Sequence, residues 1–228
     1  MTRLLDIFGS LFALLVLSPI LIVVMVVLKC TGEHEVFYRM KRVGFAGRDF
    51  GMWKFTTMLK NSPNMAGGVL TQKDDPRVLP VGKFLRKTKI NELPQLINIL
   101  TGEMSFVGPR PQARAHYDLY SADVKAKIDA VRPGLTGIGS LVFRDEEDIL
   151  TDIEAKGVAL TRDQFHDTII APYKGDLEKW YADNRNLFVY LALIFMTAWA
   201  VVSPRTNIHR KVFKSLPEIP APLKGFVG

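Results

Sequence analysis

The chain has 228 residues, enough for one domain with an additional segment. Its formal net charge is +7, 48% of its residues are hydrophobic, and its mean hydropathy is +0.11. Basic and apolar character together favour an anionic membrane surface as a partner. Nucleic-acid binding would rest on the charge alone, because no nucleic-acid-reading motif supports it, and we set that class aside.

An uncharged apolar run over residues 7–28 predicts a membrane segment, long enough to span about 30 Å of hydrocarbon. No small-residue cleavage site follows it, so we do not expect a signal peptide. Ser18-Pro19 in its middle predicts a kink, because proline removes one helical hydrogen bond. A kinked spanning helix and a re-entrant hairpin remain equally open. Basic residues at both ends mildly favour the re-entrant form, with both ends cytoplasmic.

The single cysteine, Cys30, lies just after this run. One cysteine excludes an internal disulfide and fits a reducing compartment. Its position is compatible with acylation, although an idle thiol is the commoner case.

Residues 36–41 and 50–55 predict the two strands of a β-hairpin, with turn residues Gly44 and Gly47 between them. Residues 61–79 are rich in Asn, Gly, Pro and Asp and predict a mobile loop. The loop ends in a turn carrying Asp74 and Asp75, acids that form turns more often than they catalyse.

Residues 89–111 form the central stretch of the chain. Glu92 stands at the start of a short apolar helix in which Leu93, Leu96, Ile97 and Leu100 would share one face. Gly102 would end this helix, and the turn Gly108-Pro109-Arg110-Pro111 would present Arg110 rigidly.

A dense basic run precedes Glu92 and comprises Lys83, Arg86, Lys87 and Lys89. A carboxylate at a helix N-terminus among fixed cations is suited to handling phosphate. The alternative is a surface helix with a solvated basic flank.

The C-terminal half predicts further helices. Ser121 would cap a helix over 122–131, whose buried face would hold Val124, Ile128 and Val131. After a break at 132–137 and a short apolar stretch, Arg144 heads an acidic helix start at residues 145–148. A helix over 165–183, broken near Pro172, comes next.

A second apolar run covers residues 187–202 and would reach about 24 Å as a helix, marginal for a full span. It would lie in a membrane interface with Tyr190 and Trp199 at headgroup level, or else form a buried core helix. Residues 205–228 predict an irregular tail.

Six motifs in order, each weak alone, carry a family resemblance over residues 4–202. They are Ser18-Pro19, Lys54-Phe55-Thr56-Thr57-Met58, Asp75-Pro76-Arg77 continuing through residues 82–88, Asn91-Glu92-Leu93-Pro94-Gln95-Leu96, residues 104–111 (MSFVGPRP) and Arg132-Pro133-Gly134-Leu135-Thr136. With them the chain resembles the bacterial sugar transferases. These are monotopic polyprenyl-phosphate phosphoglycosyl transferases that initiate exopolysaccharide, O-antigen or capsule assembly.

The resemblance implies an α+β, mostly helical protein on the cytoplasmic face of the bacterial inner membrane. Residues 1–31 would form the re-entrant helix broken at Ser18-Pro19, and residues 32–186 a cytoplasmic catalytic domain with a small β-hairpin and interfacial helices. A membrane-associated helix at 187–204 and the tail at 205–228 would follow. The apolar segments also offer surfaces for a homodimer.

The resemblance further implies a two-step, Mg²⁺-dependent reaction. A carboxylate attacks the sugar-bearing phosphate of a UDP-sugar and UMP leaves; the phosphosugar then passes to a polyprenyl phosphate such as undecaprenyl phosphate. Arg86, Arg110 within Pro109–Pro111, and Arg144 are the expected nucleotide or diphosphate contacts. Lys54 is either a further contact or a cap of the hairpin.

One departure matters: the family has a nucleophilic aspartate where this chain has Asn91. An amide is a poor nucleophile toward phosphate and brings no charge to Mg²⁺. The asparagine is a natural variant that uses another carboxylate, a deliberate replacement, or the mark of a silent relative. In the first case, which we favour, Glu92 is the nearest catalytic carboxylate and metal ligand, with Asp74, Asp75 and the acids at 145–148 in reserve. A membrane-anchored scaffold without turnover is the competing class.

Overall fold

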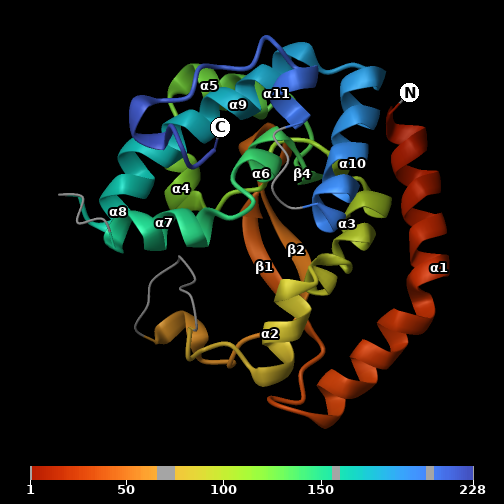
Figure 1. Cartoon of the computed structure of the whole chain (residues 1–228). Coiled ribbons are helices and arrows are strands. Elements are labelled where there is room, and N and C mark those ends of the chain that lie inside the picture. Colours follow the sequence, from red (N-terminus) through yellow and green to blue (C-terminus); the bar gives the residue numbers. More distant parts are fainter. Residues whose placement is uncertain (1, 66–74, 156–159, 204–207, 228) are drawn as a thin grey trace. The chain divides into compact units, whose positions relative to one another are not determined.

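The computed structural model describes residues 2–65, 75–155, 160–203 and 208–227. It is mostly helical with two small sheets, which confirms the predicted α+β class (Figure 1). The chain divides into two compact units, each considered by itself. Residues 3–41 and 51–102 form the N-terminal unit, and residues 42–50 and 103–228 form the C-terminal unit. The functional boundaries expected from the sequence are not tested by this division and stay predictions.

The elements that lie in or lead into the N-terminal unit are, in chain order, α1 (Thr2–Cys30), β1 (Phe37–Val43), β2 (Asp49–Phe55), the 3-10 turn η2 (Ser62–Asn64), α2 (Pro80–Lys87), the 3-10 turn η3 (Ile90–Glu92) and α3 (Gln95–Thr101). Strands β1 and β2 pair in a two-stranded sheet, which confirms the predicted hairpin. Of the predicted loop at 61–79, residues 66–74, Asp74 included, lie outside the described residues.

Helix α1 continues through Pro19 and changes direction partway along (Figure 1). Proline has no N–H to donate to the carbonyl four residues earlier, which here is that of Leu15. The Ser18 hydroxyl donates to that carbonyl instead, at 2.7 Å. The Ser18 hydroxyl therefore supplies a donor for the carbonyl that the proline leaves without one.

By length and composition α1 could cross a membrane, and no other helix in the described part of the chain meets that measure. Its large apolar side chains are mostly exposed; Phe8, Phe12 and Leu15 are 67%, 68% and 72% accessible. These exposures distinguish α1 from the buried helix of a soluble core. The re-entrant geometry stays a prediction.

The core of the N-terminal unit joins α1 to β2 and α2 through Val24, Leu28, Phe55 and Leu85. The chain also approaches itself closely where α2 begins. A Cβ at Gly82 would lie 2.2 Å from the Thr57 carbonyl oxygen, so only glycine fits there.

Helix α3 buries a different face from the one expected. Leu96 and Ile99 are buried, but Ile97 is 37% exposed, and the polar side chains of Gln95 and Asn98 are buried instead. The apolar pattern predicts the wrong buried face because Asn98, a polar residue, is buried to form hydrogen bonds with backbone groups of β2. Its Oδ1 accepts from the Trp53 N–H and its Nδ2 donates to the Gly51 carbonyl, each at 2.9 Å. Gly102 ends the helix at φ 89°, as predicted.

The C-terminal unit contains a second sheet that the sequence did not predict, formed by β3 (Ser105–Val107) and β4 (Gly134–Thr136). The strands are parallel, with Ser105 opposite Gly134 and Val107 opposite Thr136. Strands of three residues are too short for a periodic signal, so the sequence indicates these segments only as a motif and a turn. The remaining elements of this unit are η1 (Phe45–Gly47), α4 (Arg114–Asp118), α5 (Ala122–Ile128), α6 (Ile138–Val142), α7 (Glu146–Ala155), α8 (Arg162–Phe165), the π-helical η4 (His166–Ile170), α9 (Ala171–Asn184), α10 (Leu187–Val202), α11 (Ile208–Val212) and η5 (Ala221–Leu223).

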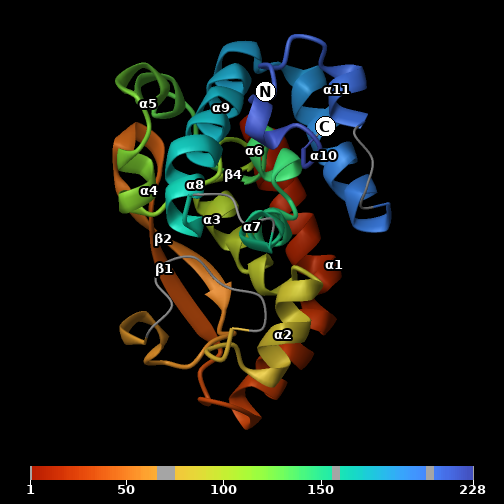
Figure 2. The ribbon, with the colours of Figure 1, turned by 60° about the vertical axis from the view of Figure 1, so that its left-hand side comes forward.

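Helix α5 buries Val124, Ile128 and the following Val131 as predicted. Ser121 occupies the N-cap position, but its hydroxyl donates to the Asp123 carboxylate and accepts no backbone N–H. The predicted break near Pro172 is wrong, because α8, the π-helical η4 and α9 follow one another as one continuous helix (Figure 2). Pro172 lies in the first turn of α9.

Helix α10 has the bounds of the predicted apolar run. Tyr190 is 2% exposed and Trp199 is 42% exposed, so the expected placement of Tyr190 at headgroup level is wrong. Because Leu193 is also buried while Phe188 and Phe195 are exposed, α10 has one core face and one open apolar face. Contact of the open face with a membrane remains a prediction. The tail is mostly irregular, but it contains α11 and buries Leu216, Leu223 and Val227.

We expect Asn98→Leu to lower the free energy of unfolding by about 2–4 kcal/mol, because two partly buried backbone groups of β2 lose their partners. Thr101→Ala on the same helix is the control, because Thr101 is exposed. Denaturant unfolding of both variants in detergent checks the difference. Equal stability of the two variants would contradict the bridging role of Asn98.

Candidate functional site

Lys54 and Glu92 meet in the N-terminal unit. Lys54 comes from β2 and Glu92 from η3, and the Nζ and Oε1 atoms are 3.1 Å apart. Both side chains are 14% exposed, so water screens the pair only partly. The structure thus joins two residues that the sequence proposed separately.

The position of Glu92 corrects one expectation. The helix after it begins at Gln95, and its N-cap is Pro94, so Glu92 is not the first residue of that helix. It lies in a 3-10 turn that the left-handed Lys89, at φ 60°, starts directly after α2. This turn, not a helix N-terminus, aims the Glu92 carboxylate toward β2.

Asn91 is 6% exposed, and its Oδ1 has no hydrogen-bond partner among the described residues. A buried amide oxygen without a partner costs free energy unless a ligand or water fills the gap. Position 91, where the resemblance implies a nucleophilic aspartate, is therefore buried and directly precedes Glu92 in sequence, and its amide oxygen has no partner among the described residues.

Arg86 is half-buried on α2, the helix that lies against η3, while Lys83, Lys87 and Lys89 are exposed. Of the basic run, Arg86 is thus the member held nearest the protein interior. The structure places Lys54, Arg86, Asn91 and Glu92 within one unit.

Asp75 and Arg77 form a buried pair in the same unit, 4% exposed each. Arg77 Nε lies 2.9 Å from Asp75 Oδ1 and Nη2 lies 2.6 Å from Oδ2, a bidentate geometry. The hydrogen bonds to Asp75 raise the pKa of the Arg77 guanidinium despite its burial. Asp75 is therefore a structural carboxylate and a poor reserve for the nucleophile.

This pair fixes the chain between β2 and α2. The Leu59 N–H donates to the Arg77 carbonyl, and the Leu79 N–H donates to the Thr57 carbonyl, each at 2.9 Å. With the close approach at Gly82, these bonds hold the end of the strand that carries Lys54 against the start of the helix that carries Arg86.

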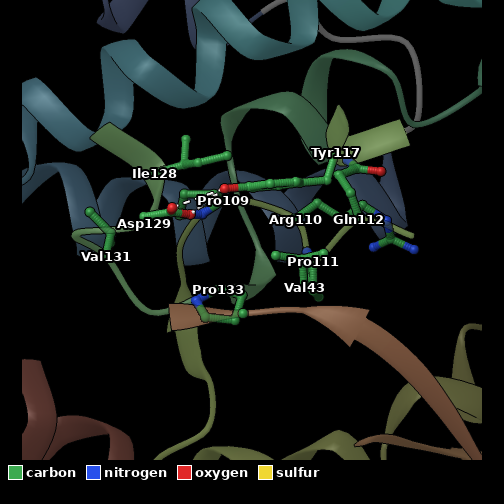
Figure 3. A pocket seen from close by; sticks show the side chains of 11 residues that line it. Val43, Pro109, Arg110, Pro111, Gln112, Tyr117, Ile128, Asp129, Val131 and Pro133 are labelled. Atoms are coloured by element: carbon green, nitrogen blue, oxygen red, sulfur yellow. Dashed lines mark hydrogen bonds between the residues drawn. The ribbon is translucent and has the colours of Figure 1, made fainter. Parts of the chain in front are cut away.

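Pro109, Arg110 and Pro111 lie in the C-terminal unit, where they line a small pocket (Figure 3). Tyr117 reaches across this pocket to Asp129, its hydroxyl 3.0 and 2.9 Å from the two carboxylate oxygens. Burial and this hydrogen bond raise the pKa of Tyr117 to about 12, so it stays protonated. The Arg110 guanidinium lies away from Asp129 in the same view.

Glu178, which the sequence analysis did not single out, lies behind the Arg110 turn. It comes from α9, is 2% exposed, and its Oε1 accepts the Arg110 backbone N–H at 3.2 Å. Burial raises its pKa to about 7, against the lowering effect of that hydrogen bond. A sequence signal existed: Glu178 falls on the same helical face as Leu177 and Tyr181, which are buried.

Arg144 precedes α7 and is half-buried. Of the acids after it, Glu146 lies 2.5 Å from Lys174 Nζ and 3.5 Å from His166 Nε2. Burial acts to raise the pKa of Glu146, but the charge and hydrogen bond of Lys174, together with the charges of His166 and Arg110, outweigh it and the net pKa is lowered. Glu146 is thus already engaged as an ion-pair partner.

Comparison with protein families matches the bacterial sugar transferase model over residues 1–204. The chain belongs to the bacterial sugar transferase family.

Individual bacterial sugar transferases are also similar to this chain in sequence. The UDP-glucose:undecaprenyl-phosphate glucose-1-phosphate transferase of Klebsiella pneumoniae is 38% identical over 159 residues, 68% of this chain and 34% of that protein. The exopolysaccharide production protein ExoY of Sinorhizobium fredii is 36% identical over 214 residues, 88% of this chain and 84% of that protein. The undecaprenyl-phosphate galactose phosphotransferase of Salmonella typhimurium is 31% identical over 214 residues, 88% of this chain and 40% of that protein. This chain thus spans about a third of the Klebsiella protein and most of ExoY.

Within this family member, the described residues hold no group of three or more His, Cys, Asp or Glu side chains arranged for a metal ion. Mg²⁺ often uses only one or two protein carboxylates together with substrate phosphates. Glu92, which follows Asn91 in sequence, would fit that sparser arrangement, and the Asn91 amide oxygen has no hydrogen-bond partner among the described residues.

We expect Asp75→Asn to lower the free energy of unfolding by about 3–5 kcal/mol, because it leaves the Arg77 charge buried without its carboxylate. Lys60→Gln is the control, because it breaks only the exposed pair with Glu35, whose side chains are 71% and 43% exposed. Chemical unfolding in detergent measures both. If the two variants unfold at the same midpoint, the buried pair does not stabilise the strand–helix junction.

Proposed function

We propose that this bacterial sugar transferase moves a sugar-1-phosphate from a UDP-sugar to a polyprenyl phosphate such as undecaprenyl phosphate. The products would be UMP and a polyprenyl-diphosphate sugar. The printed names of the relatives support this class of reaction, since two of those compared act between undecaprenyl phosphate and a sugar phosphate. The sugar itself is not identified by these names, because they differ in the sugar.

The observation that carries the proposal is the ion pair between Lys54 and Glu92. Glu92 directly follows the buried Asn91 in sequence. Phosphoryl transfer needs a nucleophile and fixed cations around the phosphorus. Glu92 is an ionisable carboxylate held in a turn, and Lys54 is a cation within 3.1 Å of it. We assign Glu92 as the acting carboxylate and Arg86 as a phosphate contact from the neighbouring helix.

In the first step, a Glu92 carboxylate oxygen forms a bond to the phosphorus next to the sugar. The bond from that phosphorus to the bridging diphosphate oxygen breaks, and UMP leaves with the electron pair. In the second step, an oxygen of the polyprenyl phosphate attacks the same phosphorus and the carboxylate leaves. Dividing one displacement into two is the usual advantage of a covalent intermediate.

Mg²⁺ is the cofactor we propose, with Glu92 as its protein ligand. When bound, it would neutralise charge on the diphosphate oxygens. Asn91 offers only a neutral amide oxygen there, a weaker ligand for a hard cation than a carboxylate.

We further propose that the protein acts at the cytoplasmic face of the inner membrane, with α1 as a re-entrant helix and the open face of α10 in the interface. The proline in the middle of α1 and the exposed apolar side chains of both helices support this placement. A polyprenyl phosphate keeps its chain in the bilayer, so a site close to the surface suits that substrate.

One observation favours a second candidate, a catalytically silent relative that binds nucleotide sugar as a scaffold. It is the amide at position 91, where the resemblance implies an aspartate nucleophile. The two candidates differ in Mg²⁺-dependent UMP release, which a scaffold does not show with any UDP-sugar.

Glu92→Gln should lower UMP release by about 10³-fold or more, because the amide can neither attack phosphorus nor leave. The assay uses purified full-length protein with Mg²⁺, undecaprenyl phosphate and a panel of UDP-sugars. Glu35→Gln, a carboxylate change on the surface of the same unit, should leave turnover unchanged. Near-normal turnover in Glu92→Gln would sink the assignment of Glu92.

Asn91→Asp separates the active variant from the silent relative. If Glu92 acts without its usual neighbour, the added aspartate should change turnover by less than about threefold, because two adjacent acids share one lysine and one of them tends to keep a proton. A gain of orders of magnitude in the same UMP assay would identify Asn91 as an inactivating residue.

A further inference from the structure

Glu178 is a buried carboxylate without a hydrogen-bonded cation among the described residues. Its Oε1 accepts the backbone N–H of Arg110 at 3.2 Å, and its Oε2 is buried with no hydrogen-bond partner there. A buried carboxylate that lacks a cationic partner is costly, so its place needs a reason. The one hydrogen bond it makes is to the turn between Pro109 and Pro111.

The surroundings of Glu178 leave room for a carboxylate and little else. A Cβ at Gly139 would lie 2.4 Å from Oε1, and a Cβ at Gly137 would lie 3.7 Å from Oε2. The bare backbone of the first turn of α6 therefore lets the side chain reach Arg110. Neither proline beside Arg110 has an N–H, so the Arg110 N–H is the donor that this turn offers.

Three ionisable groups act on Glu178 or respond to it: Arg110, Lys174 and Tyr120. Arg110 and Lys174 favour its charged form, while burial opposes that form more strongly. The charges of Glu178 and Glu146 both raise the pKa of Tyr120, after burial of that phenol. Since Lys174 is hydrogen-bonded to Glu146, it neutralises Glu178 only from a distance. The balance leaves the pKa of Glu178 at about 7, so its charge changes near neutral pH.

We propose that Glu178 is a positioning residue that orients Arg110 through its backbone N–H, and that its ionisation makes nucleotide-sugar binding depend on pH near neutrality. A carboxylate accepts a stronger hydrogen bond than a protonated acid or an amide. The Arg110 turn is therefore held most firmly above pH 7. The link to the nucleotide sugar rests on the proposed function, in which Arg110 contacts the UDP-sugar.

The effect on stability has the opposite sign. The folded state raises the pKa of Glu178 from 4.5 to about 7, so the folded protein binds this proton more tightly than the unfolded chain. Its contribution to stability is then greatest at low pH and declines as the pH rises from about 4.5 through about 7. If Glu178 served only to stabilise the fold, replacing it at pH 8 would not weaken binding of the UDP-sugar. Measuring stability and binding at the same pH therefore separates a positioning role from a packing role.

The first experiment measures KM for whichever of UDP-glucose, UDP-galactose or UDP-N-acetylgalactosamine gives turnover, between pH 6 and 8.5. In the wild type KM should fall as the pH rises through about 7. In Glu178→Gln, KM at pH 8 should be about fivefold higher, with kcat changed less than twofold and no step in KM near pH 7. Asp183→Asn is the matched control, because it removes an exposed carboxylate from the same helix and should leave KM unchanged.

Thermal unfolding of the same variants should show Glu178→Gln to be as stable as the wild type at pH 8, or more so, although it binds the UDP-sugar less tightly. A wild-type KM profile in Glu178→Gln, or an equal KM change in Asp183→Asn, overturns the proposal. So does a loss of stability at pH 8 that accounts for the lost activity.

The second experiment does not depend on turnover. In protein labelled with ¹⁵N-arginine, the Arg110 backbone amide signal is identified by its loss in Arg110→Lys. It should move with a midpoint near pH 7 in the wild type and stay constant in Glu178→Gln. If the wild-type signal does not move, the positioning role is wrong. If it moves but no UDP-sugar yields UMP, the positioning role stands and the proposed transferase activity fails.

Discussion

The amide of Asn98 is the contact on which the candidate site of the N-terminal unit depends. One face of α3 must lie on β2, and apolar packing alone would allow the helix to slide along the strand. Asn98 removes that freedom, because it bonds one N–H and one carbonyl of β2, at Trp53 and Gly51. Lys54 follows Trp53 in the strand, and Glu92 precedes α3 by one short turn. Asn98 therefore helps to fix where β2 and α3 lie, and Lys54 and Glu92, on or beside these elements, are 3.1 Å apart.

In the C-terminal unit, too, a buried side chain on a helix is hydrogen-bonded to the backbone of another segment, but here it is a carboxylate and not an amide. The parallel pair β3–β4 brings Gly108 and Gly134 so close that a Cβ on Gly134 would lie 2.1 Å from the Gly108 nitrogen. The Arg110 turn leaves that pair, and Glu178 holds its backbone from α9. In each unit a buried polar side chain from a helix fixes the backbone of a functional motif. Polar burial here costs stability and provides a defined position.

Sequence patterns predicted the elements with strong periodicity or composition: α1, the hairpin, α5 and α10. They failed where a polar side chain replaced an apolar one in the core, as with Asn98 and Glu178, and where strands were too short to repeat, as with β3 and β4. The charge pattern singled out Glu92 and the basic run that contains Arg86, and the motif resemblance added Lys54, but neither indicated that Lys54 and Glu92 form a pair. No pattern indicates that residues 38 positions apart, one in a strand and one in a 3-10 turn, form an ion pair. Such pairing depends on tertiary packing alone.

The charge balance at Asn91 and Glu92 explains how a site without the usual aspartate can be self-consistent. Two adjacent carboxylates near one lysine carry a net negative charge, and burial of one of them, at the 6% exposure of position 91, would favour its protonation. With an amide at 91, Lys54 balances a single carboxylate and Glu92 has no acidic neighbour in sequence to compete for that cation. The cost is one buried oxygen that has no partner in the described part of the chain. A donor on the substrate or a water molecule can form a hydrogen bond to that oxygen. With asparagine in place of aspartate at position 91, the site therefore requires one more hydrogen-bond donor and one less positive charge.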